Sequence, residues 1–127
     1  MGGWLTLSGI SGFLAVALGA FGAHGLQARL DGVADGAKRL SWWQTAAHYH
    51  LLHALALAVV AFAITRAPQA RFAGDGFCFG TLLFSGSLYA MALGGPRWLG
   101  AVTPLGGLAF LAGWAVVAWC GVTLGRG

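Results

Sequence analysis

Four long apolar stretches alternate with short polar segments along the chain. They cover residues 4–26, 43–64, 76–93 and 104–124, and none of them contains Asp, Glu, Lys or Arg. A helix rises about 1.5 Å per residue, so stretches of about 18 to 23 residues match a hydrocarbon core of about 30 Å. The pattern predicts an all-α membrane protein with one domain, a bundle of four transmembrane helices with antiparallel neighbours and both termini on one side.

The composition agrees with this class. Hydrophobic residues make up 58% of the chain and charged residues only 8%, and the mean hydropathy of +0.78 is far from the average of soluble proteins. Seven Lys and Arg stand against three acidic residues, but the basic residues are scattered and form no cluster. We therefore expect the lipid bilayer as the partner of these charges, and no nucleic acid.

Residues near the ends of the stretches predict where the helices begin and end. Gly25 can close the first helix, and the segment 27–41, with five charged side chains, forms the longest predicted loop. Trp42 and Trp43 follow in the position of an interfacial aromatic belt. Thr103 followed by Pro104 is typical of an N-cap with proline in the first helical turn, which predicts the start of the fourth helix there.

Small residues recur at a spacing of four, and glycine alone accounts for 22 of the 127 residues. Such ridges let helix backbones approach closely in membranes. The sequence therefore predicts tight packing of helices, either within the chain or against other membrane-protein subunits or a second copy. The ridges are Ser11, Ala15, Gly19 and Ala23; Gly76 and Gly80; and Gly121 and Gly125.

An even number of helices divides the polar segments between two sides of the membrane. Side A holds both termini and residues 65–75, and side B holds residues 27–41 and 94–103. Side A carries three Lys or Arg and side B carries four. Positive loops favour the cytoplasm, but this difference is too small to choose an orientation.

Polar side chains inside the apolar stretches gather toward side B. In the second stretch three of them share a helix face, and in the third Thr81, Ser85 and Tyr89 form a single stripe at a spacing of four. The resulting candidate cluster consists of His24, Tyr49, His50, His53, Ser85, Tyr89 and Thr103.

Polar groups at membrane depth cost free energy unless they are paired. We therefore expect His24, Tyr49, His53 and Tyr89 to lie within hydrogen-bond reach of one another across helices, directly or through one water. His48 turns away on its helix, so we expect it to lie apart at the membrane interface.

Three interpretations of the cluster are open. The first is a hydrogen-bond network between helices, worth about 0.6 to 2 kcal/mol per contact. The second is a site in which histidine and tyrosine hold a small molecule such as a quinone or a haem. The third is a transition-metal site made of His24, His50 and His53. We expect the first interpretation, and hence no cofactor.

The sequence carries no catalytic signature. The segment Ser85-Gly86-Ser87 lacks the pattern of a nucleophile elbow, and the three carboxylates lie in predicted loops, where they form no buried acid and base. We therefore expect no catalytic residue and no enzyme activity.

Several segments resemble, in order, those of a known family. They are residues 18–26, Tyr49 with residues 53–57, residues 83–89, and residues 103–107 with 110–114. The chain resembles the small bacterial membrane proteins grouped as domain of unknown function 423, and is similar to the eukaryotic transmembrane protein 256 group. The resemblance implies a multi-pass protein of the bacterial inner membrane with cytoplasmic termini. It covers the positions of His24, Tyr49, His53, Ser85, Tyr89 and Thr103, whereas His48 and His50 look particular to this sequence.

For function, we expect an integral membrane protein that is a non-enzymatic accessory or assembly component of a larger membrane complex. The alternative is a helical bundle that binds a small molecule, a quinone, a metal or haem with its side B cluster. A second alternative, an oligomeric transporter or channel, needs several copies, because four helices without charged residues offer little to line a pore.

Overall fold

The structure, a computed structural model, describes all residues from 1 to 127 and is helical throughout, without strands. The first rod begins as α1 (Gly2–Phe21), passes through the π-helical turn η1 (Gly22–Leu26) and ends as α2 (Gln27–Leu30). The second rod is α3 (Gly36–Ala63), which is 28 residues long. Both rods are long and apolar enough to cross a membrane.

The second half of the chain forms two more rods. The third runs through α4 (Ala70–Gly80), the π-helical turn η2 (Thr81–Ser85) and α5 (Gly86–Ala92). After a turn, the 3-10 helix η3 (Arg97–Ala101) leads into α6 (Thr103–Gly125), and together these form a third candidate membrane span.

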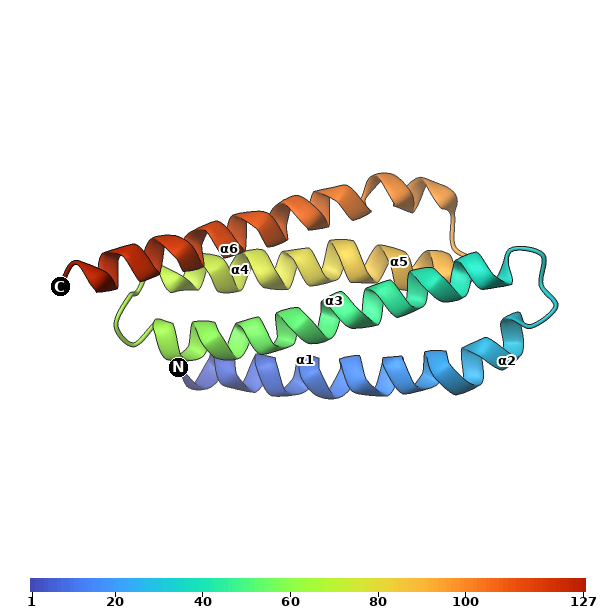
Figure 1. Cartoon of the computed structure of the whole chain (residues 1–127), viewed down its shortest axis with the longest axis horizontal. Coiled ribbons are helices and arrows are strands. Elements are labelled where there is room, and N and C mark those ends of the chain that lie inside the picture. Colours follow the sequence, from blue (N-terminus) through green and yellow to red (C-terminus); the bar gives the residue numbers. More distant parts are fainter.

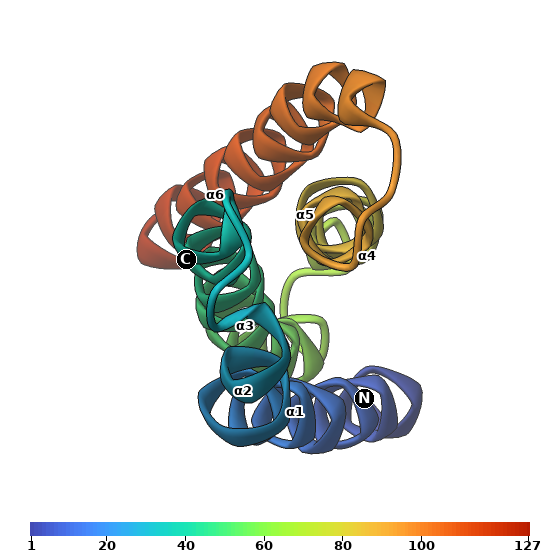
Figure 2. The ribbon, with the colours of Figure 1, turned by 90° about the vertical axis from the view of Figure 1, so that its right-hand side faces the viewer.

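The four rods stand in an open row (Figure 1). The rod α1–α2 packs on α3, α3 packs on the rod α4–α5, and that rod packs on α6. Figure 2, which looks along the rods, shows that they do not close into a ring. Each edge rod packs mainly on one neighbour, with one further contact each: Trp4 of α1 covers Gly74 of α4, and Trp114 of α6 reaches His53 of α3. Both ends of the chain lie at the same end of the rods (Figure 1).

The first two helices extend further than the sequence predicted. The chain does not end its first helix at Gly25, because the π-helical turn carries the rod on to Leu30. The residue with positive φ that ends the rod is Gly32, at 78°. The next helix begins at Gly36 and not near Trp43, so the predicted loop 27–41 shrinks to the turn 31–35.

Charged side chains make this extension possible because they reach beyond the apolar part of the rod. Lys38 lies over the ring of Trp42 at 5.5 Å, and the Nε of Arg39 donates to the carbonyl of Ala92 at 2.9 Å. Long basic side chains of this kind place their charge at the membrane surface. Arg71 and Asp75, predicted in a loop, likewise lie on the first two turns of α4, which begins at Ala70.

The predicted helix start at Thr103 is confirmed, with proline in the first turn. The predicted N-cap is wrong, because the Thr103 hydroxyl does not bond to the amides of its own helix. It pairs with the hydroxyl of Ser87 at 2.5 Å and lies 3.3 Å from the carbonyl oxygen of Leu99. The backbone just before Thr103 already forms the 3-10 helix η3. The Thr103 hydroxyl therefore links α6 to the third rod through Ser87.

Glycine allows the third and fourth rods to approach most closely. A Cβ placed on Gly76 would lie 2.9 Å from the carbonyl oxygen of Ala109 and 3.2 Å from the backbone of Gly113. The ring of Phe110 covers Gly80, which confirms the predicted ridge of Gly76 and Gly80. Gly121 and Gly125 have no neighbour within 4 Å of such a Cβ, so this second ridge packs against nothing in the chain.

Candidate functional site

The two buried histidines lie near the middle of α3, the rod that has neighbours on both sides. The side chain of His50 is 7% exposed and that of His53 is 4% exposed. They are three residues apart, so they point about 60° away from each other around the helix axis. His50 therefore meets the rods α1 and α5, and His53 meets α6.

His50 joins three rods through its two ring nitrogens. Its Nδ1 lies 3.1 Å from the hydroxyl of Tyr89 on α5, and its Nε2 lies 3.1 Å from the hydroxyl of Ser11 on α1. We call this chain of groups the Ser11–His50–Tyr89 relay. Both ring nitrogens are engaged, so the histidine acts as a bridge between the two rods that flank it.

His53 joins α3 to α6. Its Nδ1 lies 2.7 Å from the backbone carbonyl of Tyr49, and a carbonyl can only accept, so Nδ1 carries the proton. Its Nε2 then accepts a hydrogen bond from the indole Nε1–H of Trp114 at 3.1 Å. The imidazole also stacks on Phe110, with ring centroids 3.5 Å apart and planes within 10°. Hydrogen bonds and stacking together hold this ring in one tautomer and one orientation.

Two serines of the third rod complete the polar contacts between rods. Ser85, 1% exposed, donates its hydroxyl to the carbonyl of Ala46 on α3 at 2.8 Å. Ser87 pairs with Thr103, as described above. No buried side-chain nitrogen or oxygen lacks a hydrogen-bond partner, so these contacts account for the polar groups of the interior.

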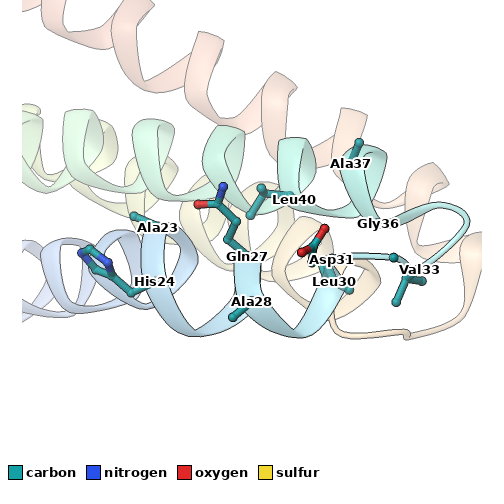
Figure 3. A pocket seen from close by; sticks show the side chains of 11 residues that line it. Ala23, His24, Gln27, Ala28, Leu30, Asp31, Val33, Gly36, Ala37 and Leu40 are labelled. Atoms are coloured by element: carbon teal, nitrogen blue, oxygen red, sulfur yellow. The ribbon is translucent and has the colours of Figure 1, made fainter.

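The predicted cluster is thus divided among several places. His24 is exposed and forms no hydrogen bond; it borders a hollow of about 670 Å³ beside the turn 31–35 (Figure 3). Figure 3 also places Gln27 and Asp31 at this hollow. His24, His50 and His53 do not converge, and the structure brings no three His, Cys, Asp or Glu residues together around a possible metal position.

The direct pairings expected among His24, Tyr49, His53 and Tyr89 do not form. Of these four residues, only His53 and Tyr49 are hydrogen-bonded to each other, and that bond goes to the backbone carbonyl of Tyr49. The hydroxyl of Tyr89 is paired with His50 instead. The Tyr49 hydroxyl has no hydrogen bond, and its ring packs on Phe84 at 4.6 Å. The reason is the open row, because α1 and α6 lie on different sides of α3 and each receives a different histidine. His48 is exposed, as expected.

Ser11 and Trp114 are the partners that the sequence did not identify. Ser11 belongs to a predicted small-residue ridge and Trp114 to a predicted apolar stretch, and neither position marks a hydrogen bond to histidine. Their roles depend on which rods stand next to α3. The only signal was the general one that a buried imidazole needs a partner.

An apolar groove runs beside the relay, between α1 and the third rod. Its volume is about 420 Å³, within the range of small-molecule sites. The stripe of Thr81, Ser85 and Tyr89 faces this groove, which confirms that the three share one helix face. The walls and floor of what we call the α1 groove are Leu7, Ile10, Ser11, Leu14, Leu18, His50, Leu57, Cys78, Thr81, Leu82, Ser85, Gly86 and Tyr89.

A second hollow of about 530 Å³ lies on the other side of α3, beside His53. It is bordered by Tyr49, Phe84, Phe110, Leu111 and Trp114, together with the start of α6. The histidine nitrogens are both occupied here, so this hollow offers aromatic surface more than hydrogen-bonding groups.

Comparisons with known proteins agree on one family. The model of a protein family of unknown function, DUF423, matches residues 18–107. A UPF0382 membrane protein of Haemophilus influenzae is 44% identical over 91% of this chain and 90% of its own length. The UPF0382 inner membrane protein YgdD of Escherichia coli is 43% identical over 96% and 91%, respectively. The UPF0382 membrane protein YwdK of Bacillus subtilis is 42% identical over 90% and 91%. No solved structure matches.

Proposed function

The chain belongs to the DUF423 family of bacterial membrane proteins, and on this premise we propose that it is a non-enzymatic accessory or assembly component of a larger complex in the inner membrane. In this proposal all four rods cross the membrane and both termini are cytoplasmic. The observation that carries it is the open row, in which the outer face of α6 has no partner within the chain.

The third rod supports a fourth crossing. Residues 70–92 form a continuous helical rod of about 33 Å at 1.5 Å per residue, enough for a hydrocarbon core of about 30 Å. Its charged residues, Arg71 and Asp75, lie within the first turns, where they can reach the membrane surface. Four crossings agree with the position of both chain ends at the same end of the rods.

The polar groups support a role without catalysis. The oxygen of Ser11 and Nε2 of His50 have the separation of a nucleophile and a base. However, the third group is Tyr89, which supplies no carboxylate to stabilise an imidazolium. Ser11 also lies inside α1, where the backbone amides are used by the helix and cannot form an oxyanion hole.

The outer face of α6 is suited to a helical partner. Val122, which is 53% exposed, lies on it, and a Cβ added to the neighbouring Gly121 or to Gly125 would meet nothing within 4 Å. Small residues let a second helix approach closely, which is how helices associate in lipid.

Photo-crosslinking in native membranes tests this role. A photoreactive amino acid at Val122 should yield a product with another membrane protein, which also co-purifies stoichiometrically in mild detergent. The same group at Leu55, which is 61% exposed on α3, should give no such product. A protein that purifies as a monomer and crosslinks at neither position contradicts the proposal. A product of twice the mass of the chain replaces it with self-association.

A further inference from the structure

We infer that the α1 groove binds the head of a lipid-soluble quinone, whose carbonyl oxygens accept hydrogen bonds from hydroxyl groups that the protein leaves free. This inference goes beyond the accessory role and rests on different residues. It is carried by the shape of the groove, by a count of donors and by depth in the membrane.

The α1 groove is floored by α3, and a tryptophan lies beyond each of its ends. At one end the ring of Trp4 on α1 covers Gly74 on α4. At the other end Trp43 donates from Nε1 to the carbonyl of Leu18 at 2.7 Å, and its ring lies 4.6 Å from that of Tyr89. His50 and Leu57 form the floor. The groove is therefore a bounded hollow whose open side faces the lipid.

The relay in the floor of the groove holds one hydrogen-bond donor too many. Neutral Ser11, His50 and Tyr89 carry three donor hydrogens, one on each side chain. The two contacts within the relay use only two of them. If the imidazole proton is on Nε2, the Ser11 hydroxyl is left over, and if it is on Nδ1, the Tyr89 hydroxyl is left over. In either tautomer a free O–H belongs to a residue that lines the groove.

Thr81 adds a second free donor. Some hydroxyl side chains of this protein bond back to their own helix, such as Thr6 to the carbonyl of Gly2 at 3.0 Å and Ser87 to that of Phe84 at 3.0 Å. Neither the Ser11 nor the Thr81 hydroxyl forms such a bond, and the Thr81 hydroxyl forms no hydrogen bond at all, although Thr81 lines the same groove. Free donors in an apolar hollow favour a ligand that offers only acceptors.

The depth of the relay in the membrane limits which kind of ligand can reach it. His50 lies about 20 Å from either end of α3 at 1.5 Å per residue, which places it near the centre of the membrane. The ester carbonyls of bilayer lipids lie at the edge of the hydrocarbon core, about 15 Å from its centre. An acceptor that reaches the relay therefore belongs to a neutral molecule dissolved in the core. A quinone ring with an isoprenoid tail has this chemistry: two carbonyl acceptors, no donor and no charge.

Gly86 provides a variant that blocks the groove without disturbing the protein. It lines the groove, and a Cβ at this position meets nothing within 4 Å. Gly86→Leu should therefore fill the groove and leave every hydrogen bond of the relay in place. Gly121→Leu is the matched control, because Gly121 is also an exposed helical glycine with open space around it but lies on α6.

The experiment titrates the full-length protein in lipid nanodiscs with decylubiquinone and follows quenching of tryptophan fluorescence, since Trp4 and Trp43 lie near the two ends of the groove. The wild type and Gly121→Leu should show the same saturable quenching. Gly86→Leu should bind at least about tenfold more weakly, as expected when a pocket is filled by a side chain. Thr81→Val removes one free donor and should weaken binding about fivefold without changing the melting temperature.

Two results overturn the inference. One is quenching that does not saturate in the wild type or that is unchanged in both Gly86→Leu and Thr81→Val. The other is binding that appears in nanodiscs of ether lipids and disappears in ester lipids, because an ester lipid then occupies the groove. Crosslinking at Val122 reports on the accessory role independently, so failure of either proposal leaves the other intact.

Discussion

Trp114 donates a hydrogen bond to His53 across 3.1 Å, and this contact joins the last rod of the row to the central helix α3. Nε2 of His53 is free to accept only because the ring proton is on Nδ1, which donates it in a hydrogen bond to the backbone carbonyl of Tyr49. A local hydrogen bond within α3 therefore sets up a contact between two rods, made by residues that are 61 positions apart in the chain.

His53→Leu should lower the free energy of unfolding by about 1 to 3 kcal/mol, because the indole N–H of Trp114 loses its acceptor and the buried imidazole loses both hydrogen bonds. The loss should appear as a lower melting temperature of the purified protein in mild detergent. His48→Leu is the control, since His48 is exposed and forms no hydrogen bond. Equal melting temperatures for the two variants would show that the contact does not stabilise the fold. Quinone binding in the α1 groove should be retained, because His53 does not line it.

Gly106→Ala should be among the most damaging single-methyl changes in the protein. A Cβ at this position would overlap the backbone of Phe84 on the third rod, which has no room to move without shifting a helix. Overpacking of this kind costs about 1 to 3 kcal/mol. Gly121→Ala, with open space around it, should be neutral. Size-exclusion profiles and melting temperatures of the two variants make the comparison, and a stable, monodisperse Gly106→Ala would contradict the close approach of α6.

Reporters of membrane side should separate the C-terminus from the first turn. A reporter fused at Gly127 is expected in the cytoplasm, and one inserted in the turn 31–35 is expected on the opposite face. The turn tolerates insertion because it is exposed and contains Gly32 at a positive φ of 78°. If both reporters are found on the same face, the four-crossing topology is wrong; an external C-terminus reverses only its direction.

Arg39→Gln should loosen the packing of the rods at their side B end. The guanidinium donates to the carbonyl of Ala92 at 2.9 Å and lies 3.8 Å from the carboxylate of Asp35. Loss of these partly exposed contacts should cost no more than about 1 kcal/mol overall. Locally, amide hydrogen exchange in the turn 93–96 should become faster, because the turn loses its link to α3. Exchange rates identical to those of the wild type would show that the turn is held by its own backbone contacts.

Much of the fold could be predicted because hydrophobic patterning is a property of the chain itself. Each of the four apolar stretches lies within one rod to within one residue, and the ridge of Gly76 and Gly80 lies at a helix contact. The helix ends were less predictable, since Lys38 and Arg71 lie on helices near the membrane surface. A charged residue marks the end of an apolar stretch but not the end of a helix whose long side chains can reach past it.

The division of the polar residues was decided by tertiary structure alone. The spacing of Thr81, Ser85 and Tyr89 determined that they share a face, because the period of a helix depends only on local geometry. Whether His50 meets Ser11, and His53 meets Trp114, depends on which rods flank α3. Small differences in packing between apolar helices decide that order, since lipid and neighbouring helices solvate apolar surface almost equally. The sequence therefore determined four apolar helices that carry polar side chains, and the open row decided that these residues form separate contacts near the middle of the rods and not one cluster.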